Sequence, residues 1–214
     1  MNEKEFEEKL ERFIETLKTT KITGYFNPWA NDGGQENSAN KRCNNLKKFL
    51  SKRMNAEFVL IGEAPSFGAR YTRIPMTSEE MIIKYLEDKY ELTSNQKPIH
   101  EDTASVVWDV INENSKKFVM WNAFAFNKNK KGDYVEPSIK DIENDKNKKI
   151  FKMFIELYPA SKIIAVGRSA QTAISYAISD YVKHPSHGGA NDFKKAFKKY
   201  VKLHKHSIGH IKIA

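Results

Sequence analysis

The sequence has a single cysteine, Cys43, among its 214 residues. One thiol cannot form an internal disulfide, and no group of cysteines is present to hold zinc or an iron–sulfur cluster. Long apolar runs are missing too, since none approaches the ~18 residues of a membrane span. The opening residues, MNEKEFEEKL, are charged and helical in pattern rather than typical of a signal peptide. We therefore expect a reduced, soluble, cytoplasmic protein.

Several catalytic signatures are also missing. The chain has no P-loop, no GxGxxG segment and no nucleophile elbow followed by an ordered acid and histidine. Five histidines lie near the C-terminus, but apart from a short HKH they form no metal-binding pattern with nearby acids: His184, His187, His204, His206 and His210. We therefore expect no metal ion and no cofactor.

Positive charge is abundant. The 36 basic and 27 acidic residues give a formal net charge of +9, which favours polyanionic partners. Two blocks carry much of it: residues 41–53 have six basic residues and no acid, and residues 184–214 have seven lysines against Asp192. These blocks either meet on one binding face or are separate solvated helix faces.

Short apolar segments alternate with helical patterns along the chain. Strands are expected over 57–62, 116–126, 161–167 and 180–184, and helices over 3–18, 39–53, 78–91, 101–113, 147–159, 168–179 and 191–205. This alternation predicts an α/β fold with a parallel sheet covered on both faces. We expect one domain over 1–214, with residues 1–53 packed on it, a long loop over 22–40 and a polar insertion over 127–149.

Unusual residues follow each expected strand, where parallel sheets place their ligand sites. They are Gly62-Glu63-Ala64-Pro65, Asn122, Gly167-Arg168 and His184-Pro185-Ser186. Each also has an ordinary structural interpretation. Glu63 could cap the next helix, the Asn122 amide could be satisfied by backbone, and HPSHGG could be a simple turn.

Three of these segments, GEAPS, WNAFAF and HPSHGG, resemble the signature segments of the uracil-DNA glycosylase superfamily in order, spacing and position. The resemblance spans roughly residues 57–197. It implies a three-layer α-β-α sandwich with a central four-stranded parallel sheet. It also implies a monomeric enzyme that flips a damaged nucleotide out of DNA and hydrolyses its N-glycosidic bond. A branch with four iron–sulfur cysteines is excluded by the single Cys43.

The resemblance assigns roles to individual residues. Asn122 matches the amide that reads O4 and N3–H of uracil, and His184 matches the imidazole at O2. Gly62 to Pro65 match the water-activating turn, with Glu63 as its carboxylate and Ala64 and Pro65 beside the base. Several members carry Asp where Ala64 stands here, so Glu63 or backbone carbonyls would hold the water.

The same resemblance extends to base stacking and DNA contacts. Met76 stands where many relatives have a stacking Phe, with Tyr71 or Phe67 as substitutes. The loop of Ser186, His187 and Gly188 matches the segment that enters the minor groove, and Lys194 and Lys195 follow it on a lysine-rich helix.

Two other functions stay open. The protein could be a catalytically weak DNA-binding relative, a hypothesis motivated by Ala64 and Met76. It could instead be a hydrolase that acts on free nucleosides or nucleotides through the same residues.

Overall fold

The computed structural model describes residues 1–30, 36–66, 68–86, 90–94, 97–127, 136–178, 180–186 and 188–207. Its strands are β1 (Phe58–Gly62), β2 (Phe118–Asn122), β3 (Lys162–Val166) and β4 (Asp180–Val182). Its helices are α1 (Glu3–Thr19), α2 (Glu36–Ser51), α3 (Ala69–Thr72), α4 (Glu79–Tyr85), α5 (Asp102–Ile111), α6 (Ile139–Ile142), α7 (Asp145–Leu157), α8 (Arg168–Ala173) and α9 (Ala190–Ser207), and a 3-10 helix, η1 (Asn112–Lys117), precedes β2.

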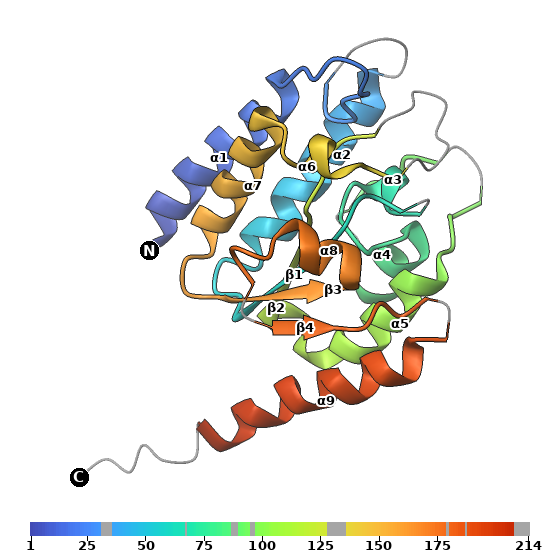
Figure 1. The fold of residues 1–214 in the computed structure, drawn as a ribbon. Coiled ribbons are helices and arrows are strands. Elements are labelled where there is room, and N and C mark those ends of the chain that lie inside the picture. Colours follow the sequence, from blue (N-terminus) through green and yellow to red (C-terminus); the bar gives the residue numbers. More distant parts are fainter. Residues whose placement is uncertain are drawn as a thin grey trace.

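The four strands form one parallel sheet in the order β2-β1-β3-β4. Every residue of β1 and β2 is buried, as expected where helices cover both faces of a parallel sheet. In Figure 1 the strand arrows point in one direction, with α1 and α7 on one side of the sheet and α5 and α9 on the other. The predicted three-layer α-β-α arrangement with a four-stranded parallel sheet is therefore confirmed.

Aromatic side chains join the sheet to both helical layers. On one face, the Trp121 ring lies 5.3 Å from Phe13 of α1 and 4.9 Å from Phe154 of α7. On the other face, the Phe118 ring lies 5.4 Å from Phe197 of α9. Residues an odd number apart in a strand point to opposite faces, so β2 contributes to both halves of the core.

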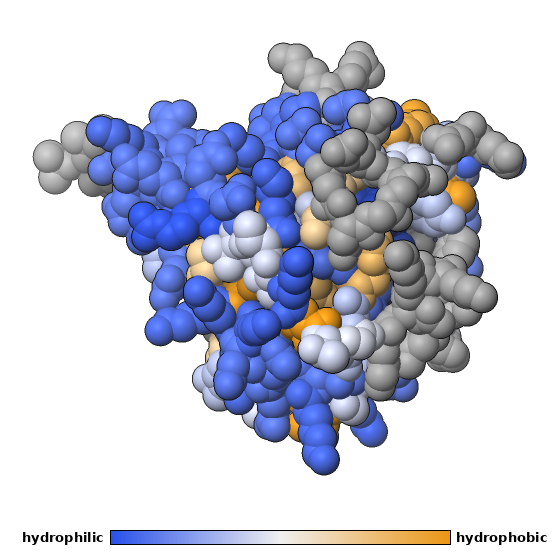
Figure 2. Space-filling view, turned by 90° about the horizontal axis from the view of Figure 1, so that it is seen from above, coloured by the Kyte–Doolittle hydropathy of each residue, from blue (hydrophilic) through white to orange (hydrophobic). Residues whose placement is uncertain are grey.

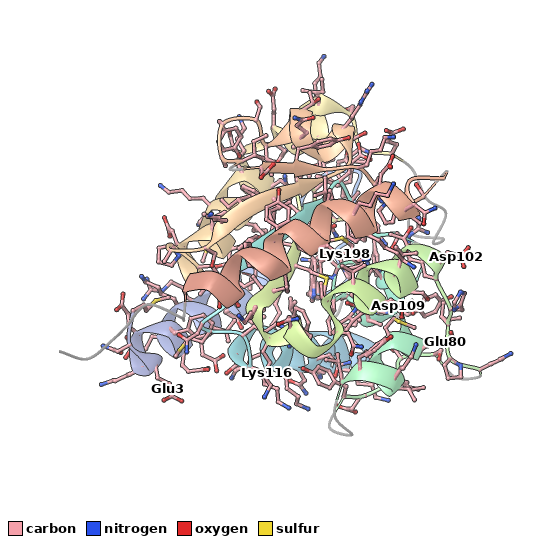
Figure 3. The ribbon with its side chains drawn as sticks, turned by 90° about the horizontal axis from the view of Figure 1, so that it is seen from below. Glu3, Glu80, Asp102, Asp109, Lys116 and Lys198 are labelled. Atoms are coloured by element: carbon pink, nitrogen blue, oxygen red, sulfur yellow. The ribbon has the colours of Figure 1, made fainter. Side chains whose placement is uncertain are left out.

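The C-terminal helix α9 has buried aromatic residues and exposed lysines. Its Phe193 and Phe197 have no exposed surface, whereas Lys194, Lys195 and Lys198 are exposed. Seen from below, α9 lies alongside α5, and the labelled Lys198 and Asp109 belong to these neighbouring helices (Figure 3). The opposite view, from above, shows a largely hydrophilic surface with smaller hydrophobic areas near its centre (Figure 2).

One expected strand is shorter than its pattern indicates. Within the apolar run 116–126, the strand β2 ends at Asn122, and only Ala123 and Phe124 make further backbone bonds to Gly62 and Glu63 among the described residues. Beyond Asn122, the buried Asn147 side chain takes the place of a neighbouring strand, because its Nδ2 donates to Ala123 O (2.8 Å) and its Oδ1 accepts from Ala125 N (3.2 Å). The chain therefore leaves the sheet while it stays buried.

Other boundaries differ as well. The expected helix over 168–179 ends at Ala173, and α2 begins at Glu36 inside the expected loop over 22–40. Within that loop, residues 31–35 lie outside the described residues, as do 128–135 within the polar insertion. α7 starts at Asp145 because Asn144 accepts a hydrogen bond from Lys146 N (3.0 Å) and caps the helix.

Among the described residues, no helix combines the length and apolar character that a bilayer crossing requires.

Candidate active site at the carboxyl ends of the strands

The segments that follow the strands lie next to each other in the structure. Gly62 and Asn122 are register partners at the ends of β1 and β2. The pairing continues past them, since Ala123 N donates to Gly62 O and Phe124 N donates to Glu63 O, both at 2.8 Å. The backbone of the GEAP turn is therefore fixed directly beside Asn122.

Asn122 has a buried side chain with an unusual environment. The residue is 4% exposed, and its side-chain amide makes no hydrogen bond to any residue that the structure describes. Its Oδ1 lies 2.8 Å from the position that a Cβ would occupy at Gly62. Only glycine at position 62 therefore leaves room for the Asn122 side chain at the end of β1.

Met76 approaches the same point from a different segment. Its Cε lies 3.9 Å from that Cβ position at Gly62, and the residue is 6% exposed. The backbone there is strained, because Met76 has a φ of 52°, a value that residues other than glycine rarely adopt. The Thr72 hydroxyl holds the loop in place by donating to Thr77 O at 2.6 Å.

His184 follows β4 and lies next to Gly167, at the end of β3. The Cβ position at Gly167 would be 3.2 Å from His184 Cβ and 3.5 Å from its Cδ2. The Ser186 backbone N–H lies 3.2 Å from His184 Nδ1, and Ser186 Oγ lies 2.6 Å from the same nitrogen. A backbone N–H can only donate, so Nδ1 accepts and the proton of the neutral imidazole is on Nε2.

Two glycines allow the tight turn after His184. A Cβ at Gly189 would lie 2.0 Å from His184 O, which no side chain could tolerate. Gly188 has a φ of 80°, a conformation that glycine adopts without strain. The predicted DNA-contact residues Ser186 and Gly188 therefore belong to one compact turn, whereas His187 lies outside the described residues.

Exposed basic side chains lie on the segments that follow β3 and β4. Arg168 follows β3, Lys183 follows β4, and Lys194 and Lys195 lie in the first turns of α9; all four are exposed. Lys183 Nζ pairs with Asp192 at 2.6 Å, and this contact and the Coulombic attraction raise the pKa of Lys183. The loop after β4 is thereby tied to the start of α9.

The remaining predicted site residues lie on the turn after β1, on α3 or outside the described residues. Pro65 is buried, and Glu63 and Ala64 are half-buried on the turn after β1. Pro65 and Asn122 line a small cavity that neither Glu63 nor His184 reaches. That Glu63, Asn122 and His184 share one cavity stays a prediction. Of the alternative stacking residues, Tyr71 is half-buried on α3 and Phe67 lies outside the described residues.

Two positioning residues had no recognisable signal in the sequence. Asn147, in the lysine-rich run, holds the segment after Asn122 through its bonds to Ala123 and Ala125. Glu101 accepts from Ala69 N at 3.2 Å, and burial raises the pKa of its carboxyl. Both lie in polar stretches that predict exposure, so only tertiary structure reveals their roles.

Comparison with known proteins identifies the fold. No protein-family model matches the sequence, and no curated protein matches it. Among solved structures, wild-type SMUG2 of Pedobacter heparinus matches 94% of this chain and 97% of its own, with a TM-score of 0.60 and 17% sequence identity. The protein is therefore similar in fold to this SMUG2 structure.

Proposed function

We propose that the protein is a DNA glycosylase that hydrolyses the N-glycosidic bond of uracil, or a related deaminated base, flipped out of DNA. The observation that carries this proposal is the Asn122 amide, which is 4% exposed and has no hydrogen-bond partner among the described residues. An amide that makes no hydrogen bond to the described residues keeps its donor and its acceptor available to a ligand at the strand end.

The positions of two glycines at neighbouring strand ends support a small ring as that ligand. The Asn122 side chain, on β2, lies next to Gly62. The His184 side chain, on the segment after β4, lies next to Gly167. β1 and β3, whose ends carry these glycines, are neighbours, and neighbouring strands are ~4.8 Å apart. In the proposed complex, one pyrimidine ring would lie between these two side chains.

The chemistry of the two side chains matches opposite sides of uracil. The Asn122 amide offers one donor to O4 and one acceptor to N3–H, while cytosine presents the reverse pattern. Because Nδ1 of His184 accepts from Ser186 N, its ring proton is on Nε2, a donor suited to O2. Hydrogen-bond donors aimed at the oxygen where charge develops lower the barrier.

The reaction is a hydrolysis in which the C1′–N1 bond breaks and its electron pair leaves with the base. Water adds its oxygen to C1′ and gives up a proton, and the departing base takes one proton, so the products are an abasic sugar and free base. Glu63, half-buried on the turn after β1, would accept the proton from water, with backbone carbonyls of that turn as further acceptors.

DNA is the proposed partner because exposed basic side chains lie on the segments that follow β3 and β4. Arg168, Lys183, Lys194 and Lys195 are exposed there, and phosphate contacts from Lys and Arg supply most of the affinity of DNA-binding proteins. Ser186 and Gly188 lie in the turn between these lysines, where they would approach the backbone of the flipped nucleotide.

The test is an excision assay on single- and double-stranded oligonucleotides that contain uracil, hypoxanthine, xanthine or mismatched thymine, followed by alkaline cleavage of abasic sites. We expect the wild type to excise uracil. Asn122→Ala should lower the rate at least ~100-fold, the loss typical of one removed transition-state contact, while non-specific DNA binding is retained. Asn44→Ala, an exposed asparagine on α2, is the matched control.

Three outcomes would contradict the proposal. Excision by Asn122→Ala within a few-fold of wild type would show that the base binds elsewhere. DNA binding without any abasic product would identify a catalytically weak relative. Release of uracil from free deoxyuridine, without dependence on DNA length, would identify a nucleoside hydrolase.

A further inference from the structure

A small cavity beside the candidate site is lined in part by residues that the proposed reaction does not use. Trp29, Arg73 and Trp121 line it together with Pro65 and Asn122. Its volume is about 10 Å³, close to the ~10–15 Å³ that one water-sized particle needs. The cavity is therefore too small for a nucleobase or a phosphate group.

Three of the residues that line the cavity carry buried N–H donors without acceptors. The indole Nε1 atoms of Trp29 and Trp121 and the Nε atom of Arg73 have no hydrogen-bond partner among the described residues. The two tryptophans stack, with ring centroids 6.0 Å apart, and they are 3% and 1% exposed. Buried donors left without acceptors are rare in folded proteins and call for an explanation.

Arg73 brings a positive charge to the same cavity. The residue is 5% exposed, and its Nη1 donates to Asn127 Oδ1 at 3.1 Å. Asn127 is a neutral acceptor, so this bond leaves the charge uncompensated. Burial and the like charges of Arg42 and Arg70 hold the pKa of the guanidinium well below its usual range.

The backbone conformation at Arg73 is strained. Arg73 ends α3 with a φ of 57°, a left-handed conformation that costs a side chain about 1 kcal/mol or more. Strain of this kind persists where the surrounding structure enforces it. Here the loop is held by the Thr72 hydroxyl, which donates to Thr77 O at 2.6 Å and accepts from Ile74 N at 3.1 Å.

We propose that this cavity is a binding site for one monatomic anion of chloride size, held by Arg73 Nε and the Nε1 atoms of Trp29 and Trp121. An anion accepts from all three donors and offsets the guanidinium charge. A water molecule would be a poorer occupant, because it must also donate two hydrogen bonds. Because Pro65 and Asn122 share the cavity, the anion would stabilise the segments that form the candidate site. The inference does not depend on which reaction that site performs.

A crystallographic experiment tests the site directly. Crystals of the full chain grown or soaked in sodium bromide should show an anomalous peak in the cavity, within contact of the two indole nitrogens and Arg73 Nε. A cavity that holds only a water-like peak without anomalous signal would overturn the proposal.

A solution experiment tests the donors individually. The melting temperature of the full chain is compared in sodium chloride and in sodium gluconate, whose anion is too large for the cavity, at equal ionic strength. With chloride at about five times its Kd, we expect melting to rise by ~2–4 °C over gluconate.

Three variants identify the source of that rise. Trp29→Phe keeps an aromatic ring but removes one donor, so the chloride-dependent rise should fall by at least half. Trp108→Phe is the matched control and should keep the full rise, because Trp108 Nε1 already donates to Thr77 Oγ1 at 3.0 Å. If Trp29→Phe does not fold, Arg73→Gly serves instead, since glycine accepts the positive φ. Equal rises in wild type and Trp29→Phe would refute the assignment.

Discussion

At the scale of single residues, two glycines determine the shape of the candidate site. Gly62 leaves the space that Asn122 Oδ1 occupies, and Gly167 leaves the space beside the His184 ring. Neither glycine would contact the base through a side chain. Their contribution is to let polar side chains of the outer strands reach the ends of the central strands.

The substitution Gly62→Ala tests this role. The added methyl group would lie 2.8 Å from Asn122 Oδ1, so the amide must move by several tenths of an ångström. We expect the excision rate to fall by roughly 100-fold, since small displacements of positioned groups have effects of this size. The rate is measured under single-turnover conditions, with circular dichroism to verify folding.

Gly24→Ala provides the comparison for that substitution. Gly24 has a φ of 82°, and no atom lies within 4 Å of its Cβ position, so the change adds backbone strain away from the strand ends. Stability should fall without a change in excision. If both variants excise uracil at the wild-type rate, Gly62 is not a determinant of the site.

At the scale of secondary-structure elements, helix α7 supports the strand that carries Asn122. Asn147, in the first turn of this helix, is 2% exposed, and its Nδ2 donates to both Ala123 O and Ile142 O. It therefore links α6, α7 and the segment after β2 through one side chain. A helix that packs behind the sheet thus sets the conformation of the chain at the sheet's end.

The substitution Asn147→Ala should disturb stability and excision together. It leaves buried backbone groups without partners, which costs about 1–3 kcal/mol for each group left unsatisfied, and it frees the segment next to Asn122. Asn144→Ala removes only the cap of α7, which costs about 1 kcal/mol, and should leave excision unchanged. Chemical denaturation and the excision assay measure the two effects; equal excision by both variants would argue against a positioning role.

At the scale of the whole molecule, the protein is positively charged, and some of its basic residues lie on the segments proposed to bind the substrate. The net charge is +9, and exposed Arg168, Lys183, Lys194 and Lys195 lie on the segments that follow β3 and β4. Raising salt from ~50 to ~200 mM should therefore weaken DNA binding by orders of magnitude, as expected for several phosphate contacts.

Substitutions near the two ends of the sheet distinguish the effect of local charge on DNA binding from the effect of the overall net charge. The double variant Lys194→Ala, Lys195→Ala should reduce the salt slope by ~0.9 for each phosphate that the protein no longer neutralises. Lys162→Ala changes an exposed lysine at the opposite end, where β3 begins, and should leave the slope unchanged. Fluorescence anisotropy on a labelled oligonucleotide measures both, and a flat salt response in the wild type would exclude this mode of binding.

The sequence predicts the sheet well because the apolar patterns that indicate its strands are local. The apolar positions of residues 3–18, and the short apolar runs that become β1 and β3, depend on neighbours a few residues away. The end of β2 could not be predicted, because Ala123 to Phe126 are as apolar as the strand and leave it through a bond to Asn147. Likewise, the burial of Arg73, which lines a cavity with Trp29 and Trp121, depends on tertiary packing that a polar segment does not indicate.

The position of a bound base is the most direct test of the proposed function. A crystal structure of the protein with DNA that contains 2′-fluoro-2′-deoxyuridine, whose fluorine slows cleavage by destabilising the cationic sugar, would reveal it. We predict a flipped uracil between Asn122 and His184 above the ends of β1 and β3, with Met76 against its ring. A uracil that remains stacked in DNA, or that binds away from Asn122, would contradict the proposed function.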